Sequence, residues 1–161
     1  MEYVHTFDFV NYTRLHALEN GLESGFLEFT LQKDNILKID DFQSGCNDPN
    51  YHQGTEMILY LLNSFSFPIK KIHGRLSTED AIQKYKEIGT NTHKLTGWQT
   101  SIPFYANLEK YINNSTFHLY TGSHSYREDI TDKYNENPQK TIIDLINENQ
   151  DCSFSIDIDN A

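Results

Sequence analysis

The sequence predicts a mixed α/β (α+β) fold, in which a mostly antiparallel sheet has helices on both faces and an acidic C-terminal helix–strand extension. Three observations predict it. Apolar residues alternate with polar ones in the first third of the chain, recur at helical spacing after residue 54, and alternate again near the end. A chain of 161 residues buries enough surface to fold without disulfides. We expect one domain over residues 1–161, with residues 123–161 as its extension.

Three strands are expected in the first third of the chain. Alternation predicts a strand from Tyr3 to Val10 and another from Leu27 to Leu31. A third is expected from Ile36 to Phe42. Turn-forming residues at 19–21 and 33–35 flank the second of these runs. This order predicts an antiparallel meander.

Helices and strands are expected to alternate in the middle of the chain. Apolar side chains at spacings of three and four predict an amphipathic helix over residues 55–65. A strand over residues 70–76 follows, and Ser77 is a suitable cap for a helix over residues 78–88. If the strands on either side of residues 55–65 are parallel, their connection is a right-handed crossover.

The second half is expected to hold two further helices and two strands. Ser101 and Pro103 are typical of a helix start. A strand over residues 116–121 follows, then a helix that begins at Asn137 and a last strand over 152–158. That last strand alternates cleanly, and we expect it at a sheet edge, paired within the chain or with a second copy. The buried stripe of the helix that Ser101 opens is expected to be Phe104, Leu108, Tyr111 and Ile112.

The charge of the chain limits its partners. The sequence has 23 acidic and 13 basic residues, a net charge of −10, and nine of the acidic residues lie in residues 123–161. A general nucleic-acid binder needs a basic surface, so this class is excluded. The balance favours a cationic partner, or no charged partner, and mimicry of DNA is a further alternative.

Targeting, membrane and metal signals are weak throughout. The N-terminus lacks the basic and apolar regions of a signal peptide, and the longest apolar run is far below the ~20 residues of a membrane span. We therefore expect a cytoplasmic protein with no membrane partner. Cys46 and Cys152 form no CxxC pair and are expected to be reduced thiols. The seven histidines lack metal-ligand spacing, so no metal is expected.

The segment His52-Gln53-Gly54-Thr55-Glu56 follows a strand and a polar loop and opens an amphipathic helix. This arrangement resembles the pyrophosphate-binding segment of the GNAT superfamily of N-acetyltransferases. Residues 70–77 resemble the next strand of that fold, 101–105 its helix start, and 117–120 its closing strand. The resemblance covers residues 25–121 and rests on order and spacing more than on one motif.

The resemblance implies acetyl-CoA as the co-substrate. Backbone amides at the helix N-terminus cradle its pyrophosphate in that family, because free N–H groups and the helix dipole attract anions. The family pattern is Arg/Gln-x-x-Gly-x-Gly/Ala. Gly54 stands at its last position, whereas His52 and Pro49 occupy the other two, and Gln53 is a substitute anion contact. The implied cofactor-binding residues are Phe42, Ser44, His52, Gln53, Gly54 and Thr55.

The resemblance also implies direct acyl transfer to an amine. Tyr105 stands where the family has an acid that protonates the leaving thiolate. The candidate bases are Asp40, Asp41 and Glu28, and a backbone amide around residues 42–44 polarises the thioester carbonyl. Each residue also has a structural interpretation, Tyr105 as a core aromatic and the three carboxylates as ordinary strand residues.

Two other functions stay open. One is a catalytically inactive protein of the same fold that binds or inhibits a basic protein partner through its acidic surface. The other is a small-ligand sensor. In the enzyme, the acceptor is a small-molecule or peptide amine, for which the net acidity favours a cation. A homodimer is compatible with each of these functions.

Overall fold

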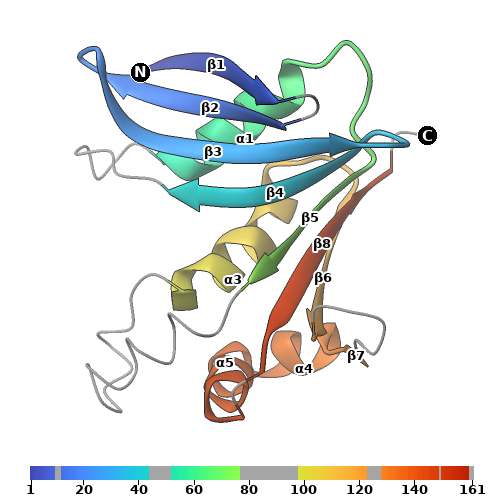
Figure 1. Cartoon of the computed structure of the whole chain (residues 1–161). Coiled ribbons are helices and arrows are strands. Elements are labelled where there is room, and N and C mark those ends of the chain that lie inside the picture. Colours follow the sequence, from blue (N-terminus) through green and yellow to red (C-terminus); the bar gives the residue numbers. More distant parts are fainter. Residues whose placement is uncertain (10–11, 44–51, 77–97, 123–127, 149, 160–161) are drawn as a thin grey trace. The chain divides into compact units, whose positions relative to one another are not determined.

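The structure is a computed structural model of the whole chain. It divides the chain into two compact units, of which unit 1 comprises residues 1–73 and 158–161 and unit 2 comprises residues 74–157. The residues that it describes are 1–9, 12–43, 52–76, 98–122, 128–148 and 150–159 (Figure 1).

Unit 1 is built on a four-stranded antiparallel meander. Its strands are β1 (Glu2–Phe9), β2 (Tyr12–Glu19), β3 (Leu22–Gln32) and β4 (Ile36–Gln43). The prediction of three strands was wrong because it left β2 unassigned. The helix-favouring types Leu, Ala and Glu in β2 obscure an alternation that pairing with β1 and β3 fixes.

The two turns that the sequence predicts join the strands of the meander. Asn20 and Gly21 connect β2 to β3 with φ values of 56° and 81°. Asp34 and Asn35, with φ values of 66° and 61°, lie between β3 and β4. Consecutive residues with positive φ form the hairpin turn that matches the twist of the strands, and Asn, Asp and Gly accept this conformation best.

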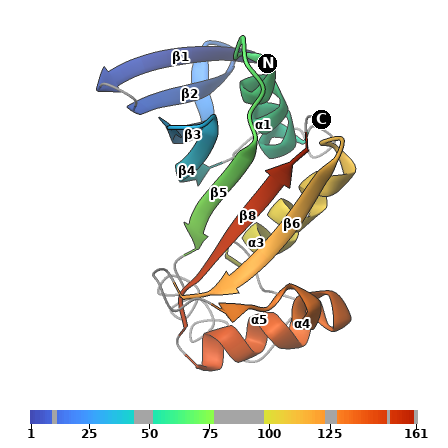
Figure 2. The ribbon, with the colours of Figure 1, turned by 90° about the vertical axis from the view of Figure 1, so that its right-hand side faces the viewer.

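The meander buries one face, which we call the inner face. Helix α1 (Gln53–Asn63) contributes the fully buried Met57, Ile58 and Leu61, and its Tyr60 stacks on Tyr3 of β1 with 4.8 Å between ring centroids. Figure 2 shows α1 beside these strands. The predicted helix over residues 55–65 is thus confirmed, two residues earlier at each end. The buried inner-face residues are Thr13, Leu15, Ala17, Gly25, Leu27, Phe29, Leu37 and Ile39.

Strand β5 (Lys71–Leu76) follows α1 and confirms the predicted strand over residues 70–76. Within unit 1, Lys70 N donates 2.9 Å to the Asn35 carbonyl, and Ile158 N donates 2.9 Å to the Lys70 carbonyl. His73 Nε2 lies 2.7 Å from Gln32 Oε1. The predicted helix over residues 78–88 and its cap Ser77 lie outside the described residues.

Unit 2 contains the remaining elements. These are α3 (Trp98–Asn107), the 3₁₀ turn η2 (Leu108–Lys110), β6 (Ser115–Thr121), β7 (Glu128–Asp129), α4 (Thr131–Glu136), α5 (Pro138–Asn147) and β8 (Cys152–Ile158). Strand β8 has the predicted bounds. Asn137 precedes α5 and accepts a hydrogen bond from Lys140 N at 3.2 Å, as expected of a cap. The sequence did not predict β7 or α4.

The start of α3 differs from the prediction. The helix begins at Trp98, so Pro103 lies inside it rather than in its first turn. The regular helix ends at Asn107, and the buried stripe differs from the predicted one: Tyr105 is buried, Phe104 is half-buried and Tyr111 is 52% exposed. The predicted burial of Leu108 and Ile112 is confirmed.

The eight strands form one mostly antiparallel sheet in the order β1-β2-β3-β4-β5-β8-β6-β7. Strands β5 and β8 each have residues in both units. The mixed α/β class is therefore confirmed. The expectation that the last strand lies at a sheet edge was wrong, because β8 lies between β5 and β6. Ser155, which alternation places opposite Phe154 and Ile156, is buried as they are, so both faces of β8 are covered there.

Candidate functional site

The start of α1 carries the predicted anion-binding segment. His52 occupies the N-cap position, is exposed and makes no capping hydrogen bond through its side chain. The first hydrogen bond of the helix runs from Glu56 N to the His52 carbonyl at 3.0 Å. The N–H groups of Gln53, Gly54 and Thr55 precede it and point along the positive end of the helix dipole. Gly54 is buried and Thr55 half-buried.

Gln53 is held by the sheet. Its side chain is 3% exposed and donates from Nε2 to Ser24 Oγ at 2.6 Å. Gly25 allows this approach, because a Cβ there would lie 2.8 Å from the Gln43 carbonyl oxygen and closer still to Gln53 Oε1. The amide of Gln53 therefore has a structural partner at the place where the sequence suggested an anion contact.

The end of β4 carries three predicted site residues. Asp40 accepts a 2.6 Å hydrogen bond from Thr30 Oγ1, and Lys38 Nζ lies 3.6 Å from its other oxygen. Asp41 is exposed and accepts from the backbone N–H of Phe42 at 2.8 Å. That N–H, a candidate for polarising the thioester, is thus engaged by a carboxylate. Ser44, like Pro49 and Cys46, lies outside the described residues.

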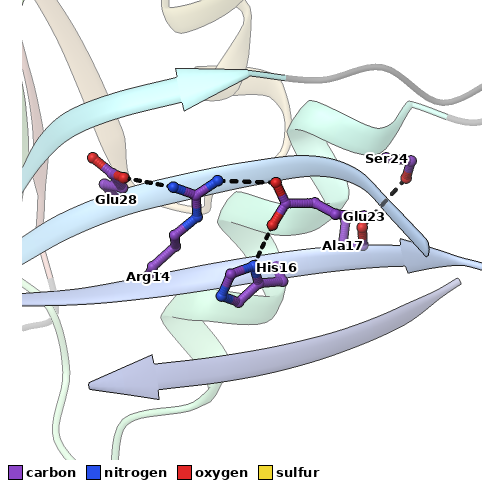
Figure 3. Close-up of polar contacts among 6 residues, drawn as sticks. All are labelled: Arg14, His16, Ala17, Glu23, Ser24 and Glu28. Carbon is purple, nitrogen blue, oxygen red and sulfur yellow. Dashed lines mark hydrogen bonds and ion pairs between the residues drawn. The ribbon is translucent and has the colours of Figure 1, made fainter. Parts of the chain in front are cut away.

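Glu28 belongs to a four-residue charge network on β2 and β3 (Figure 3). Arg14 donates from Nη1 to Glu28 at 2.8 Å and from Nη2 to Glu23 at 2.9 Å, and Glu23 also contacts His16. The Arg14 guanidinium stacks over the Phe26 ring at 3.8 Å. The sequence predicted Glu28 as a site residue but not Arg14. The alternation of residues along β2 is the signal that could have revealed Arg14.

The charges of this network act on each other's protonation. Burial lowers the pKa of Arg14, but the hydrogen bonds and charges of Glu23 and Glu28 outweigh it and raise the pKa overall. The hydrogen bond with His16 lowers the pKa of Glu23, and the hydrogen bond and charge of Arg14 add to this effect against burial. Arg14 and Glu23 are therefore fixed in their charged forms near neutral pH.

Tyr105 lies in unit 2, whereas the candidate carboxylates lie in unit 1. Its side chain is 5% exposed, and its ring stacks on Phe154 of β8 with centroids 3.8 Å apart and an interplanar angle of 18°. The geometry gives Tyr105 a packing role in the core of unit 2, which leaves its hydroxyl as the one group able to carry chemistry.

Unit 2 also contains a group of charged side chains around His118 that the sequence did not predict. His118 of β6 lies between two carboxylates, with Nδ1 3.6 Å from Asp129 and Nε2 3.4 Å from Asp157. Hydrogen bonds from Thr131, through its hydroxyl and its N–H, lower the pKa of Asp129, and the charge of His118 adds to this. Alternation places His118 and Asp157 on strands, but the sequence does not reveal that β6 and β8 are neighbours.

Cys152, the one cysteine among the described residues, is poorly reactive. Cys152 is buried, and burial, together with the charge of Asp151, raises the pKa of its thiol to about 12, so it is a poor nucleophile at neutral pH.

Across the described ranges, no group of three or more His, Cys, Asp or Glu side chains is placed to hold a metal ion. None of the helices in the described part of the chain has the length and apolar character of a membrane span.

Comparison with family models, with curated proteins and with solved structures finds no match for this chain.

Proposed function

We propose that the chain is an acyl-CoA-dependent N-acyltransferase that moves an acetyl group from acetyl-CoA to a primary amine by direct attack. The observation that carries the proposal is the start of α1, where the N-cap residue His52 makes no capping hydrogen bond through its side chain. A pyrophosphate is the kind of anion that such a helix end attracts. The side chain of Glu56, in the same turn, is exposed to solvent.

The order of elements supports the same proposal. The resemblance rests on a strand, a loop, a helix and a second strand, and the structure has β4, α1 and β5 at those positions, with β4 and β5 adjacent in the sheet. Helix α3 and strand β6 follow where the resemblance places them. Together these elements make the α1 start the best-supported place for the cofactor.

The proposed reaction is one substitution at the thioester carbonyl. The amine nitrogen attacks the carbonyl carbon, a C–N bond forms, and the C–S bond breaks. By the resemblance, a carboxylate takes the proton that the amine loses and a tyrosine hydroxyl gives its proton to the leaving thiolate; the candidates for these roles are Glu28, Asp40 or Asp41 and Tyr105. The resemblance implies that a backbone N–H around residues 42–44 stabilises the carbonyl oxygen as its charge develops.

A second candidate function has observations of its own. Tyr105 is packed against Phe154, Glu28 is ion-paired with Arg14, and Asp40 accepts from Thr30. Groups engaged in this way suit a catalytically inactive protein that binds a basic partner through its acidic surface. The two functions differ in whether acetyl-CoA binds at all.

Calorimetric titration with acetyl-CoA and with free CoA separates them. We expect micromolar binding of both ligands by the wild-type chain and its loss in His52→Glu, because a carboxylate at this exposed position repels the pyrophosphate while suiting the helix dipole. Gln139→Glu is the matched control, since it adds the same charge to the exposed first turn of α5. No heat up to millimolar ligand overturns the acyltransferase proposal.

A further inference from the structure

The sheet of unit 1 has a second face, the outer face, which lies opposite α1. The strand register places its residues in rows, because residues paired across strands share a face. The rows are Glu2–Leu18–Glu23, Val4–His16–Phe26–Gln43, Arg14–Glu28–Asp41 and Thr30–Lys38. The α1 helix, the one helix among the described residues of unit 1, covers the inner face and leaves these rows outside.

Apolar side chains lie together on the outer face. Val4 is 38% exposed, and Leu18 and Phe26 are half-buried, in two adjacent rows. The open face of an antiparallel sheet is normally polar, since one face packs on the core and the other meets water. These three side chains, with the Arg14 guanidinium over the Phe26 ring, give the outer face an apolar part beside its charges.

The charge on this face is negative and its basic groups are already engaged. Among the described side chains of these rows, with Asp40 beside Thr30 and Lys38, five carboxylates stand against two basic groups, a net charge of −3 when His16 is neutral. Arg14 binds Glu23 and Glu28, and Lys38 lies beside Asp40. The net negative charge therefore lies on carboxylates that neither Arg14 nor Lys38 neutralises. The five carboxylates are Glu2, Glu23, Glu28, Asp40 and Asp41.

We propose that the outer face binds a lysine- or arginine-rich segment of a partner protein, whose apolar side chains cover Val4, Leu18 and Phe26. Two copies of this chain cannot meet through the face without bringing two net charges of −3 together, and a nucleic acid is repelled in the same way. The inference goes beyond acyl transfer. The two proposals share the carboxylates Glu28, Asp40 and Asp41, but peptide binding involves neither the α1 start nor Tyr105, so it is tested separately from acetyl-CoA binding.

The probe for this proposal is a fluorescein-labelled peptide of alternating lysine and leucine. A length of about 12 residues spans the four strands, which lie ~4.8 Å apart. Binding is measured by fluorescence anisotropy at about 50 mM salt, where screening is modest. Backbone amide NMR shifts locate the bound peptide, and a peptide with glutamate in place of lysine tests the role of charge.

Two variants probe the two parts of the surface. Val4→Lys places a cation among the apolar residues, and Glu2→Gln/Asp41→Asn removes two charges without touching Arg14. We expect about tenfold weaker binding in each. Glu136→Gln/Glu148→Gln is the matched control, because it removes two exposed carboxylates from unit 2 and should leave affinity within about twofold.

The outcomes are distinguishable. Shifts confined to β1, β2, β3 and β4, with weaker binding in both outer-face variants and unchanged binding in the control, support the proposal. Equal weakening in the control variant shows general attraction to an acidic protein and overturns it. Shifts at residues 128–159 overturn it as well, and so does equal binding of the glutamate peptide.

Discussion

Gln53, the first residue of α1, donates a 2.6 Å hydrogen bond from Nε2 to the Oγ of Ser24 in β3. The Ser24 hydroxyl in turn donates to the Ala17 carbonyl of β2 at 3.4 Å. One polar side chain therefore ties the start of the helix to two strands of the sheet. The position of the α1 N-terminus, and of the anion site proposed there, follows from this contact.

Ser24→Ala should destabilise the chain by about 1–3 kcal/mol, because it removes a hydrogen-bond acceptor of a buried amide. Urea unfolding followed by circular dichroism measures this difference. Ser64→Ala is the matched control. Its hydroxyl bonds to the Tyr60 carbonyl at the exposed end of α1, and its loss should change stability by less than about 0.5 kcal/mol. A Ser24 variant as stable as the Ser64 variant would contradict the role of the Gln53 contact.

Gly25→Ala should cost about 1–3 kcal/mol of stability for a steric reason. The new Cβ would lie 2.8 Å from the Gln43 carbonyl and closer to Gln53, so helix and strand must move apart. Gly21→Asn is the control, since no atom lies within 4 Å of a Cβ there and Asn accepts its φ of 81°. Hydrogen exchange at the first turn of α1 should rise in the Gly25 variant alone. Unchanged exchange there would contradict the close approach.

Helix α1 and strand β8 could be predicted from the sequence because their periodicity is local. The helical spacing around Met57 and the alternation through Phe154 are each visible within one segment, and both elements are confirmed. The strand β2 was missed because its residue types favour a helix and only its neighbours make it a strand.

The contacts at the site could not be predicted in the same way. Spacing placed Gln53 at a helix start, but the direction of its side chain depends on Ser24 and Gly25, which lie almost thirty residues away. Glu28 was found as a polar strand residue, whereas its partner Arg14 depends on the register of β2 with β3. These facts are non-local, and only the folded chain brings them together.

Glu23→Gln should reduce the loss of folding stability that the wild-type chain shows as the pH falls. The folded pKa of Glu23 lies below its usual 4.5, chiefly because of His16 and then Arg14. Its ionised form therefore stabilises the fold above pH 4.5, and this contribution is lost as the pH falls through the folded pKa. We expect a difference of about 0.5–1 kcal/mol, because the pair is partly exposed and screened.

Thermal unfolding of both proteins between pH 2.5 and 7 tests this prediction. The gap between wild type and Glu23→Gln should be largest near neutral pH and should close in acid. His16→Gln removes the first partner only and should give an intermediate profile. A gap that persists unchanged at pH 2.5 would show that Glu23 acts through packing rather than charge.

Tyr105→Phe separates the two candidate functions. The substitution keeps the ring that stacks on Phe154 and removes the hydroxyl, so the core of unit 2 should be retained with a change below about 1 kcal/mol. If the chain transfers acetyl groups with Tyr105 as the acid, kcat should fall by about 10²-fold while the dissociation constant for acetyl-CoA stays the same. Tyr111→Phe makes the same chemical change at a 52% exposed position and should leave kcat unaltered. Equal rates in wild type and Tyr105→Phe would remove Tyr105 from the mechanism, and its burial would then be explained by packing alone.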